Sequence, residues 1–154
     1  MVGMVGLLAG TGASQSTTDI FFVGLQSITP AAWLAAWDEA IEWVKEQDFD
    51  PDFMAWSAGF DGLAGDPGNY GFSSLTPWDY GLMAEKWLAW ASDKRCAGRV
   101  LAILEGGYLV AGGMFSALAT AVACVLKALI KAGVARKHKM QEEEREEDKE
   151  EKKA

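Results

Sequence analysis

Two loops carry the side chains whose types and spacing could do chemistry. A glycine-rich loop over 59–74 contains Asp61 and Asp66, and a second loop after Leu104 places Tyr108 behind two glycines. A carboxylate can ligate a metal ion, and a phenol hydroxyl can donate a hydrogen bond to an oxyanion. Held close together, these groups could act as a metal ligand and an oxyanion donor.

Histidine and cysteine are scarce, which limits the chemistry of the chain. The sequence contains one histidine, His138, and two cysteines, Cys96 and Cys124, which do not form a CxxC pair. Two cysteines cannot build a disulfide scaffold, so we expect a reducing compartment and a structural role for both. A single histidine leaves little for proton transfer or for metal binding.

The elements that must position the two loops follow from the apolar patterns. Short apolar runs predict buried strands over 20–23, 53–57 and 100–104. Thr-Pro pairs at Thr29 and Thr76 predict the starts of two helices, and a third helix is expected over 114–131. Their apolar stripes comprise Leu34, Trp37, Ile41 and Val44 in the first helix and Tyr80, Met83, Trp87 and Ala91 in the second.

This alternation of strand and helix predicts an α/β fold with a parallel sheet. Parallel strands are normally covered by helices on both faces, so both faces of each strand are apolar. The predicted strands agree with this, because apolar and polar residues do not alternate along them. The carboxyl ends of parallel strands meet at one edge of the sheet, and sites form there. We therefore expect the loop that carries Asp61 and Asp66 to lie on the same edge as the loop that carries Tyr108. Trp56 precedes the first loop and is the tryptophan expected nearest to the site.

Composition excludes several classes of protein. The chain has 154 residues, of which 50% are hydrophobic, so it is too apolar to be disordered and long enough for one core. The sequence contains no run of eighteen apolar residues, so it predicts no membrane span. The net charge of −8 argues against binding a nucleic-acid backbone.

The two ends differ in composition from the centre. We predict a flexible leader over 1–19, without the basic start of a signal peptide, and a folded domain over 20–135. A charged tail over 136–154 is either a solvated helical extension or a disordered segment.

Several segments in the two loops resemble the zinc-dependent histone deacetylase family, in its class II and bacterial deacetylase-like branch. The segments are Pro51-Asp52, Ser57-Ala58-Gly59-Phe60-Asp61, Ala64-Gly65-Asp66-Pro67, Leu75-Thr76-Pro77 with Tyr80, and Leu104-Glu105-Gly106-Gly107-Tyr108. The resemblance covers about 21–131 and is strongest over 50–108. It implies a three-layer parallel-sheet α/β fold of the arginase/deacetylase type, present here as the C-terminal portion of the domain.

The resemblance also implies roles for individual residues in the hydrolysis of acetyl-lysine. Asp61 would supply an oxygen to Zn²⁺, and Tyr108 would donate to the acetamide carbonyl. Gly106 and Gly107 would line the narrow acetyl-lysine channel. Asp66, before a proline, is expected to serve only the turn.

The departures from the family pattern bear on activity. The tandem histidine pair and the Asp-x-His segment of the family are missing before Asp61, Gly68 stands where leucine is common, and Leu109 replaces asparagine. We therefore expect that this chain alone does not hold zinc and is inactive. The alternatives are a catalytically dead binding or regulatory module and an unrelated small α/β ligand-binding domain. A truncated gene model, the product of a split gene and a degenerate paralogue all remain open.

Expected partners follow from the same resemblance. They are an acetylated protein or histone tail, or an acetylpolyamine, with no nucleic acid and no membrane, in the cytoplasm or the nucleus. A sheet that lacks neighbouring strands exposes an edge, so self-association through that edge is also expected.

Overall fold

The computed structural model describes residues 3–10, 18–25, 28–46, 50–94, 96 and 98–152. Its strands are β1 (Gly3–Gly10), β2 (Thr18–Leu25), β3 (Met54–Ala58) and β4 (Val100–Leu104). Its α-helices are α1 (Pro30–Glu46), α2 (Pro77–Ser92) and α3 (Ala117–Glu151), with short 3₁₀ turns at Pro67–Asn69 and Gly113–Phe115. The chain is thus a partial α/β domain, as the sequence predicts.

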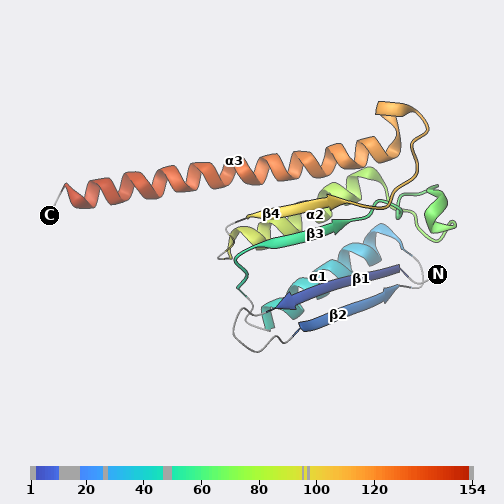
Figure 1. Cartoon of the computed structure of the whole chain (residues 1–154), viewed down its shortest axis with the longest axis horizontal. Helices are drawn as coiled ribbons and strands as arrows, with labels where there is room; N and C mark the ends of the chain where they lie inside the picture. The colour runs from blue at the N-terminus through green and yellow to red at the C-terminus, as the bar shows by residue number, and fades with distance from the viewer. Residues whose placement is uncertain are drawn as a thin grey trace.

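The parallel pair β3 and β4, joined by α2, positions the site. Met54 pairs with Val100 and Ala58 with Leu104, so both strands end at the same level. Figure 1 shows both arrows pointing toward the end of the molecule where the loop 59–75 lies. The expected meeting of the two loops at one edge is confirmed.

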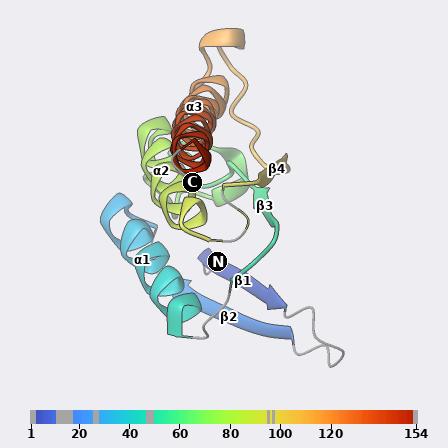
Figure 2. The same cartoon turned by 90° about the vertical axis from the view of Figure 1, so that its left-hand side faces the viewer.

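Only one face of this small sheet is covered. Met54, Trp56 and Ala58 alternate with exposed residues and point into the core. On the opposite face, Leu101 and Ile103 each keep 47% of their surface exposed. Figure 2 shows α2 and α3 on one side of β3 and β4 and no element on the other. The expected covering of both faces is therefore not found among the described residues.

The strand predicted over 20–23 exists, but its expected place in the parallel sheet is wrong. β2 pairs with β1 in an antiparallel hairpin, and β3 with β4 forms a separate sheet. An antiparallel hairpin joins neighbouring segments through a short connection, whereas parallel pairing requires a long crossover. The strand β1 also lies within the stretch for which the sequence predicts a flexible leader.

The two Thr-Pro signals start helices as predicted. The Thr29 hydroxyl accepts from the backbone N–H of Ala32 at 3.2 Å, and the backbone N–H of Thr76 donates to the Asp79 carboxylate at 2.7 Å. The stripe of α2 is fully buried, and that of α1 is buried except for the half-buried Leu34. Their tryptophans pack as a connected cluster with Phe60 and Tyr80; its members are Trp33, Trp37, Trp87 and Trp90.

Helix α3 is longer than predicted and includes the charged tail. The Ser116 hydroxyl accepts from the backbone N–H of Ala119 at 3.1 Å and begins the helix. Ala121, Val125 and Ala128 are buried on the side that packs against α2. Of the two alternatives for the tail, the helical one is confirmed, and Figure 1 shows α3 projecting past the rest of the molecule.

Helix α3 also bears on the prediction about membrane spans. By length and composition alone, the helix over residues 117–150 contains an eighteen-residue window apolar enough to cross a membrane. The sequence analysis predicts no such span, since the sequence contains no unbroken run of eighteen apolar residues; Lys127 and Lys131 interrupt this stretch. One side of the helix packs against α2, and 17% of its apolar window is buried.

Candidate active site at the carboxyl edge of the sheet

Backbone hydrogen bonds hold the two loops against each other just beyond the strands. The N–H of Phe60 donates to the carbonyl oxygen of Gly106 at 2.8 Å, and the N–H of Glu105 donates to that of Ala58 at 3.2 Å. These bonds extend the pairing of β3 and β4 by a further step. They fix the position of Asp61, the next residue, relative to the glycine pair.

Asp61 has a buried oxygen atom that lacks a partner. Its Oδ1 atom is inaccessible to water and makes no hydrogen bond. The carboxylate lies against the backbone of Gly106, where an added Cβ atom would stand 1.7 Å from Oδ1. The side chain of Asn69 holds the other end of the residue, because its amide donates to the carbonyl oxygen of Asp61 at 2.9 Å. A buried carboxylate oxygen without a donor is suited to a cation.

Asp66 does much more than close a turn. Its side chain is 2% exposed. One oxygen accepts from the backbone N–H of Gly68 at 2.8 Å. The other accepts from the backbone N–H groups of Tyr108 at 2.6 Å and Leu109 at 3.0 Å. The predicted turn role is present, but the carboxylate also ties the first loop to the second. One signal in the sequence could indicate this role, namely an acidic residue in a loop at the same edge.

Tyr108 lies beside Asp61 on the outer side of the site. A Cβ atom added at Gly68 would meet the Tyr108 ring at 3.3 Å and the Asp61 Cβ at 3.1 Å, so both residues border the same small space. Tyr108 is 61% exposed. The structure therefore brings the two predicted site residues together, with the tyrosine facing outward.

The two glycines before Tyr108 are required by close packing. A Cβ atom at Gly106 would collide with Asp61. Gly107 has a φ of +126°, and a Cβ atom there would stand 2.8 Å from that of Phe60. This packing gives a reason for both glycines that is separate from lining a channel. Trp56, in contrast, is buried in the core and is 9% exposed.

Tyr80 is a buried neighbour of the site that the sequence indicated only as part of a helical stripe. Burial raises the pKa of its hydroxyl well above the usual range, the Asp61 carboxylate raises the pKa further, and a hydrogen bond with the backbone of Gly62 opposes these effects. The phenol therefore stays neutral, which avoids a second negative charge beside Asp61.

We expect the free energy of unfolding to fall as the pH rises above about 10, where a tyrosine in the unfolded chain ionises while Tyr80 keeps its proton. Tyr80→Phe should flatten this fall. At high pH the Tyr80 hydroxyl keeps its proton only in the folded chain, and the substitution removes that hydroxyl. Urea unfolding at a series of pH values measures the slope. Tyr70→Phe, at an exposed tyrosine, is the control, and equal slopes in the two variants would contradict the assignment.

Among the described site residues, Asp61 is suited to be one ligand of a metal ion. Asp61 offers a buried, unpaired oxygen. Within the part of the chain that the structure describes, no three histidine, cysteine or carboxylate side chains gather as a metal site requires. A catalytic zinc site takes three protein ligands and a water. The described residues of this chain therefore do not fit a zinc ion on their own.

The sequence of this chain is similar to that of known deacetylases. The sequence profile of the histone deacetylase domain matches residues 6–146. Histone deacetylase 15 of Arabidopsis thaliana is 44% identical over 78 residues, covering 51% of this chain and 12% of that protein. A probable deacetylase of Archaeoglobus fulgidus is 43% identical over 77 residues, covering 50% of this chain and 20% of that protein.

A solved structure agrees with the sequence matches. The crystal structure of the HDA15 HD domain superimposes with a TM-score of 0.54 at 27% identity, covering 69% of this chain and 26% of that one. The fold is thus of the arginase/deacetylase type, and the alternative of an unrelated small α/β domain is wrong. The matched stretches span between 8% and 20% of the curated relatives.

Proposed function

This chain belongs to the histone deacetylase family, and we propose that it forms the C-terminal part of a zinc-dependent site that hydrolyses acetyl-lysine. The observation that carries the proposal is the pairing of a buried, unpaired carboxylate oxygen on Asp61 with the exposed Tyr108 at one edge of the sheet. These are the two residue types that the family pattern requires at these positions.

Each residue has a role that its surroundings support. Asp61 would be one ligand of the metal in a completed site, and Asn69 and the backbone of Gly106 hold it in place. Tyr108 donates its hydroxyl proton in a hydrogen bond to the acetamide oxygen, and Asp66 holds the backbone from which it extends. Gly106 and Gly107 leave room beside the acetyl-lysine stem. A bound zinc ion would polarise the carbonyl and lower the pKa of a water molecule.

The remaining ligands and the proton-transfer groups must come from outside the described residues. His138 is the only histidine in the sequence, and it is exposed on α3. We therefore propose that the chain alone is inactive. The purified chain should retain no stoichiometric zinc and should not deacetylate an acetyl-lysine peptide.

The test begins with the transcript upstream of Met1. An in-frame segment that encodes a His-His pair and an Asp-x-His motif supports a complete deacetylase. The longer product should then hydrolyse an acetyl-lysine peptide, and Asp61→Asn should abolish zinc retention. Tyr108→Phe should lower kcat by about 10²–10³, the typical cost of losing one oxyanion donor, while Tyr70→Phe should leave it unchanged.

The alternative function is a catalytically dead binding or regulatory module. The presence of one metal ligand without its partners favours it. A stop codon directly before Met1, with no upstream exon carrying histidines, would support it. Turnover by the isolated chain that Asp61→Ala abolishes would contradict both functions, because each expects this chain to be inactive alone.

Partners and location are proposed on the same basis. The substrate is an acetylated protein such as a histone tail, or an acetylpolyamine, in the cytoplasm or the nucleus, and chromatin regulation is the expected process. The net charge of −8 would attract a basic substrate by steering rather than by specific recognition. Neither a nucleic acid nor a membrane is a proposed partner.

A further inference from the structure

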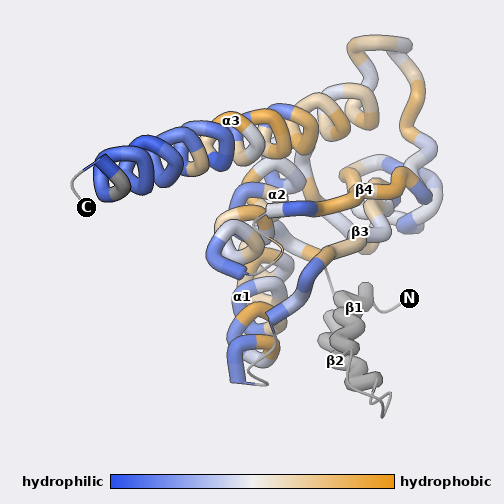
Figure 3. Tube along the Cα trace, turned by 60° about the vertical axis from the view of Figure 1, so that its left-hand side comes forward, coloured by the Kyte–Doolittle hydropathy of each residue, from blue (hydrophilic) through white to orange (hydrophobic). Residues whose placement is uncertain are grey.

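The charges on helix α3 are separated into two blocks. From Ala117 to Gln141 the helix has five lysines and arginines and no acidic residue, whereas residues 142–151 hold eight acidic and two basic residues. Figure 3 shows the change along the helix from apolar to strongly hydrophilic. Like charges packed at the C-terminal end also oppose the helix dipole, whose negative pole lies there.

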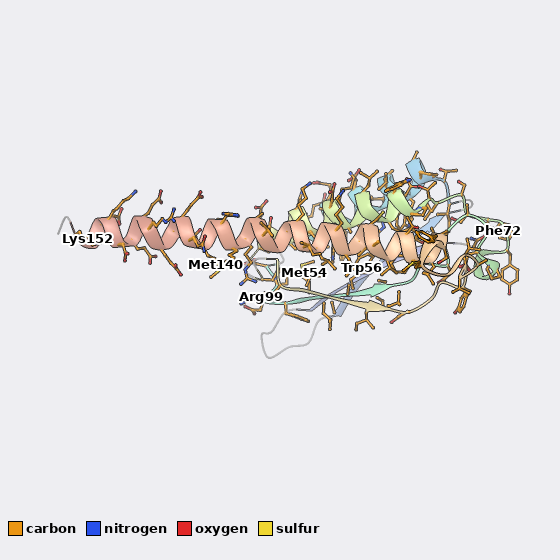
Figure 4. The ribbon with its side chains drawn as sticks, turned by 90° about the horizontal axis from the view of Figure 1, so that it is seen from above. Met54, Trp56, Phe72, Arg99, Met140 and Lys152 are labelled. Atoms are coloured by element: carbon orange, nitrogen blue, oxygen red, sulfur yellow. The ribbon has the colours of Figure 1, made fainter. Side chains whose placement is uncertain are left out.

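Among the described residues, no other element packs against the acidic block. Every residue from Lys137 to Glu150 is exposed. Figure 4 shows Met140 near the end of the body marked by Arg99, with Lys152 far beyond it. The ion pair that forms in this part joins Lys139 to Glu143 at 4.0 Å. An unfavourably charged helix end of this kind is stabilised by a cationic surface.

The basic block borders a groove beneath α3. The groove has a volume of about 880 Å³ and runs between α3 and the end of α2. Apolar residues such as Leu88, Ala132 and Met140 line it. Four cations and three carboxylates also line it: Lys94, Lys131, Arg136, Lys139, Glu85, Asp93 and Glu143. Lys131 pairs with Glu85, but Arg136 and Lys94 have no ion pair with a carboxylate among the described residues.

The groove-lining face of α3 continues into the acidic block. Residues 132, 136, 139 and 143 line the groove at spacings of three and four. The same repeat brings Glu147 and Glu150 onto this face. One face of one helix therefore offers cations to a neighbour at its groove and carboxylates at its tip.

We propose that the occupant of the groove is the acidic end of α3 from a second copy of this chain. An antiparallel pair of helices centred near Glu143 sets residue 147 opposite residue 139 and residue 150 opposite residue 136. Glu147 then meets Lys139, and Glu150 meets Arg136. At the axis, each Glu143 keeps its own Lys139 one turn away. A two-fold axis fills both grooves at once, as symmetric dimers require.

The full chain should form a dimer at low salt that weakens as salt is added. Sedimentation equilibrium should show the dissociation constant rising at least roughly tenfold between about 0.05 M and about 0.5 M NaCl, because exposed ion pairs are screened. A monomer at every salt concentration would overturn the proposal.

Charge reversal separates this dimer from one formed by another surface. Arg136→Glu with Lys139→Glu should give monomers, as should Glu147→Arg with Glu150→Arg. Mixing these two variants should give a heterodimer, because each groove then meets an arm of opposite charge. Failure to form the heterodimer, or a dimer that survives either reversal by pairing through the sheet edge, would overturn the proposal.

A matched control changes as many charges on another face. Glu144→Arg with Asp148→Arg places the new cations away from the groove face, so the dimer should persist. Circular dichroism and tryptophan fluorescence should show that all three variants keep the wild-type fold. Loss of the dimer in this control would mean that net charge, rather than the groove, governs association.

Discussion

Replacing Gly106 by alanine is expected to lower the free energy of unfolding by about 2 kcal/mol, as overpacking of a tight contact does. The new Cβ atom would stand 1.7 Å from the Asp61 Oδ1 atom and 2.6 Å from its Cγ atom, so the carboxylate must leave its place. The melting temperature should fall by about 4–8 °C. In a complete site, the same variant should also lose its metal.

Gly133→Ala is the matched control for this substitution. Gly133 lies in α3, where an added Cβ atom meets nothing within 4 Å. Alanine is the better helix former, so this variant should be up to about 1 kcal/mol more stable. A Gly106→Ala protein as stable as the wild type would show that Asp61 does not lie against this glycine.

Asp66→Asn is expected to cost roughly 3 kcal/mol, since hydrogen bonds to a charged group contribute more than neutral ones. The amide group has about the size of the carboxylate, but its nitrogen cannot accept a hydrogen bond. Either Gly68 or the pair Tyr108 and Leu109 therefore loses its acceptor. Urea unfolding measures the loss, and hydrogen exchange should quicken at the amides of Tyr108 and Leu109.

Asp93→Asn makes the same chemical change at an exposed position. Its stability should stay within about 0.5 kcal/mol of the wild type, as is usual for surface substitutions. Unchanged exchange at Tyr108 and Leu109 in Asp66→Asn would contradict the role of Asp66 in holding the second loop.

The sequence predicts the local elements of this fold well because their signals are local. Thr76-Pro77 starts α2, and the run from Val100 to Leu104 forms β4 with the bounds expected. The pairing of strand β2 could not be predicted in this way. An apolar run indicates a strand but does not say which other strand it pairs with. β2 pairs with β1, whose residues lie outside the apolar run.

In the candidate site, too, the local features could be predicted from the sequence and the non-local contacts could not. Residue type and loop position indicate an acidic residue and a tyrosine at one edge, and the family resemblance singles out Asp61 and Tyr108. The parallel register brings their loops together. The role of Asp66 was missed because its partners at Tyr108 and Leu109 are backbone groups, which every residue has. The neutral state of Tyr80 depends on burial beside Asp61, which a helical stripe does not reveal.

The contact between Asp61 and Gly106 also sets an order on folding during synthesis. Gly106 leaves the ribosome 45 residues after Asp61, a delay of about 2–9 s at usual rates of translation. Throughout this interval the carboxylate remains in water, and the apolar side of β3 has no strand β4 beside it. Non-local closures of this kind are slow because the intervening chain must lose entropy first. The buried oxygen of Asp61 is thus created in a single late event, when the whole β3–α2–β4 unit closes.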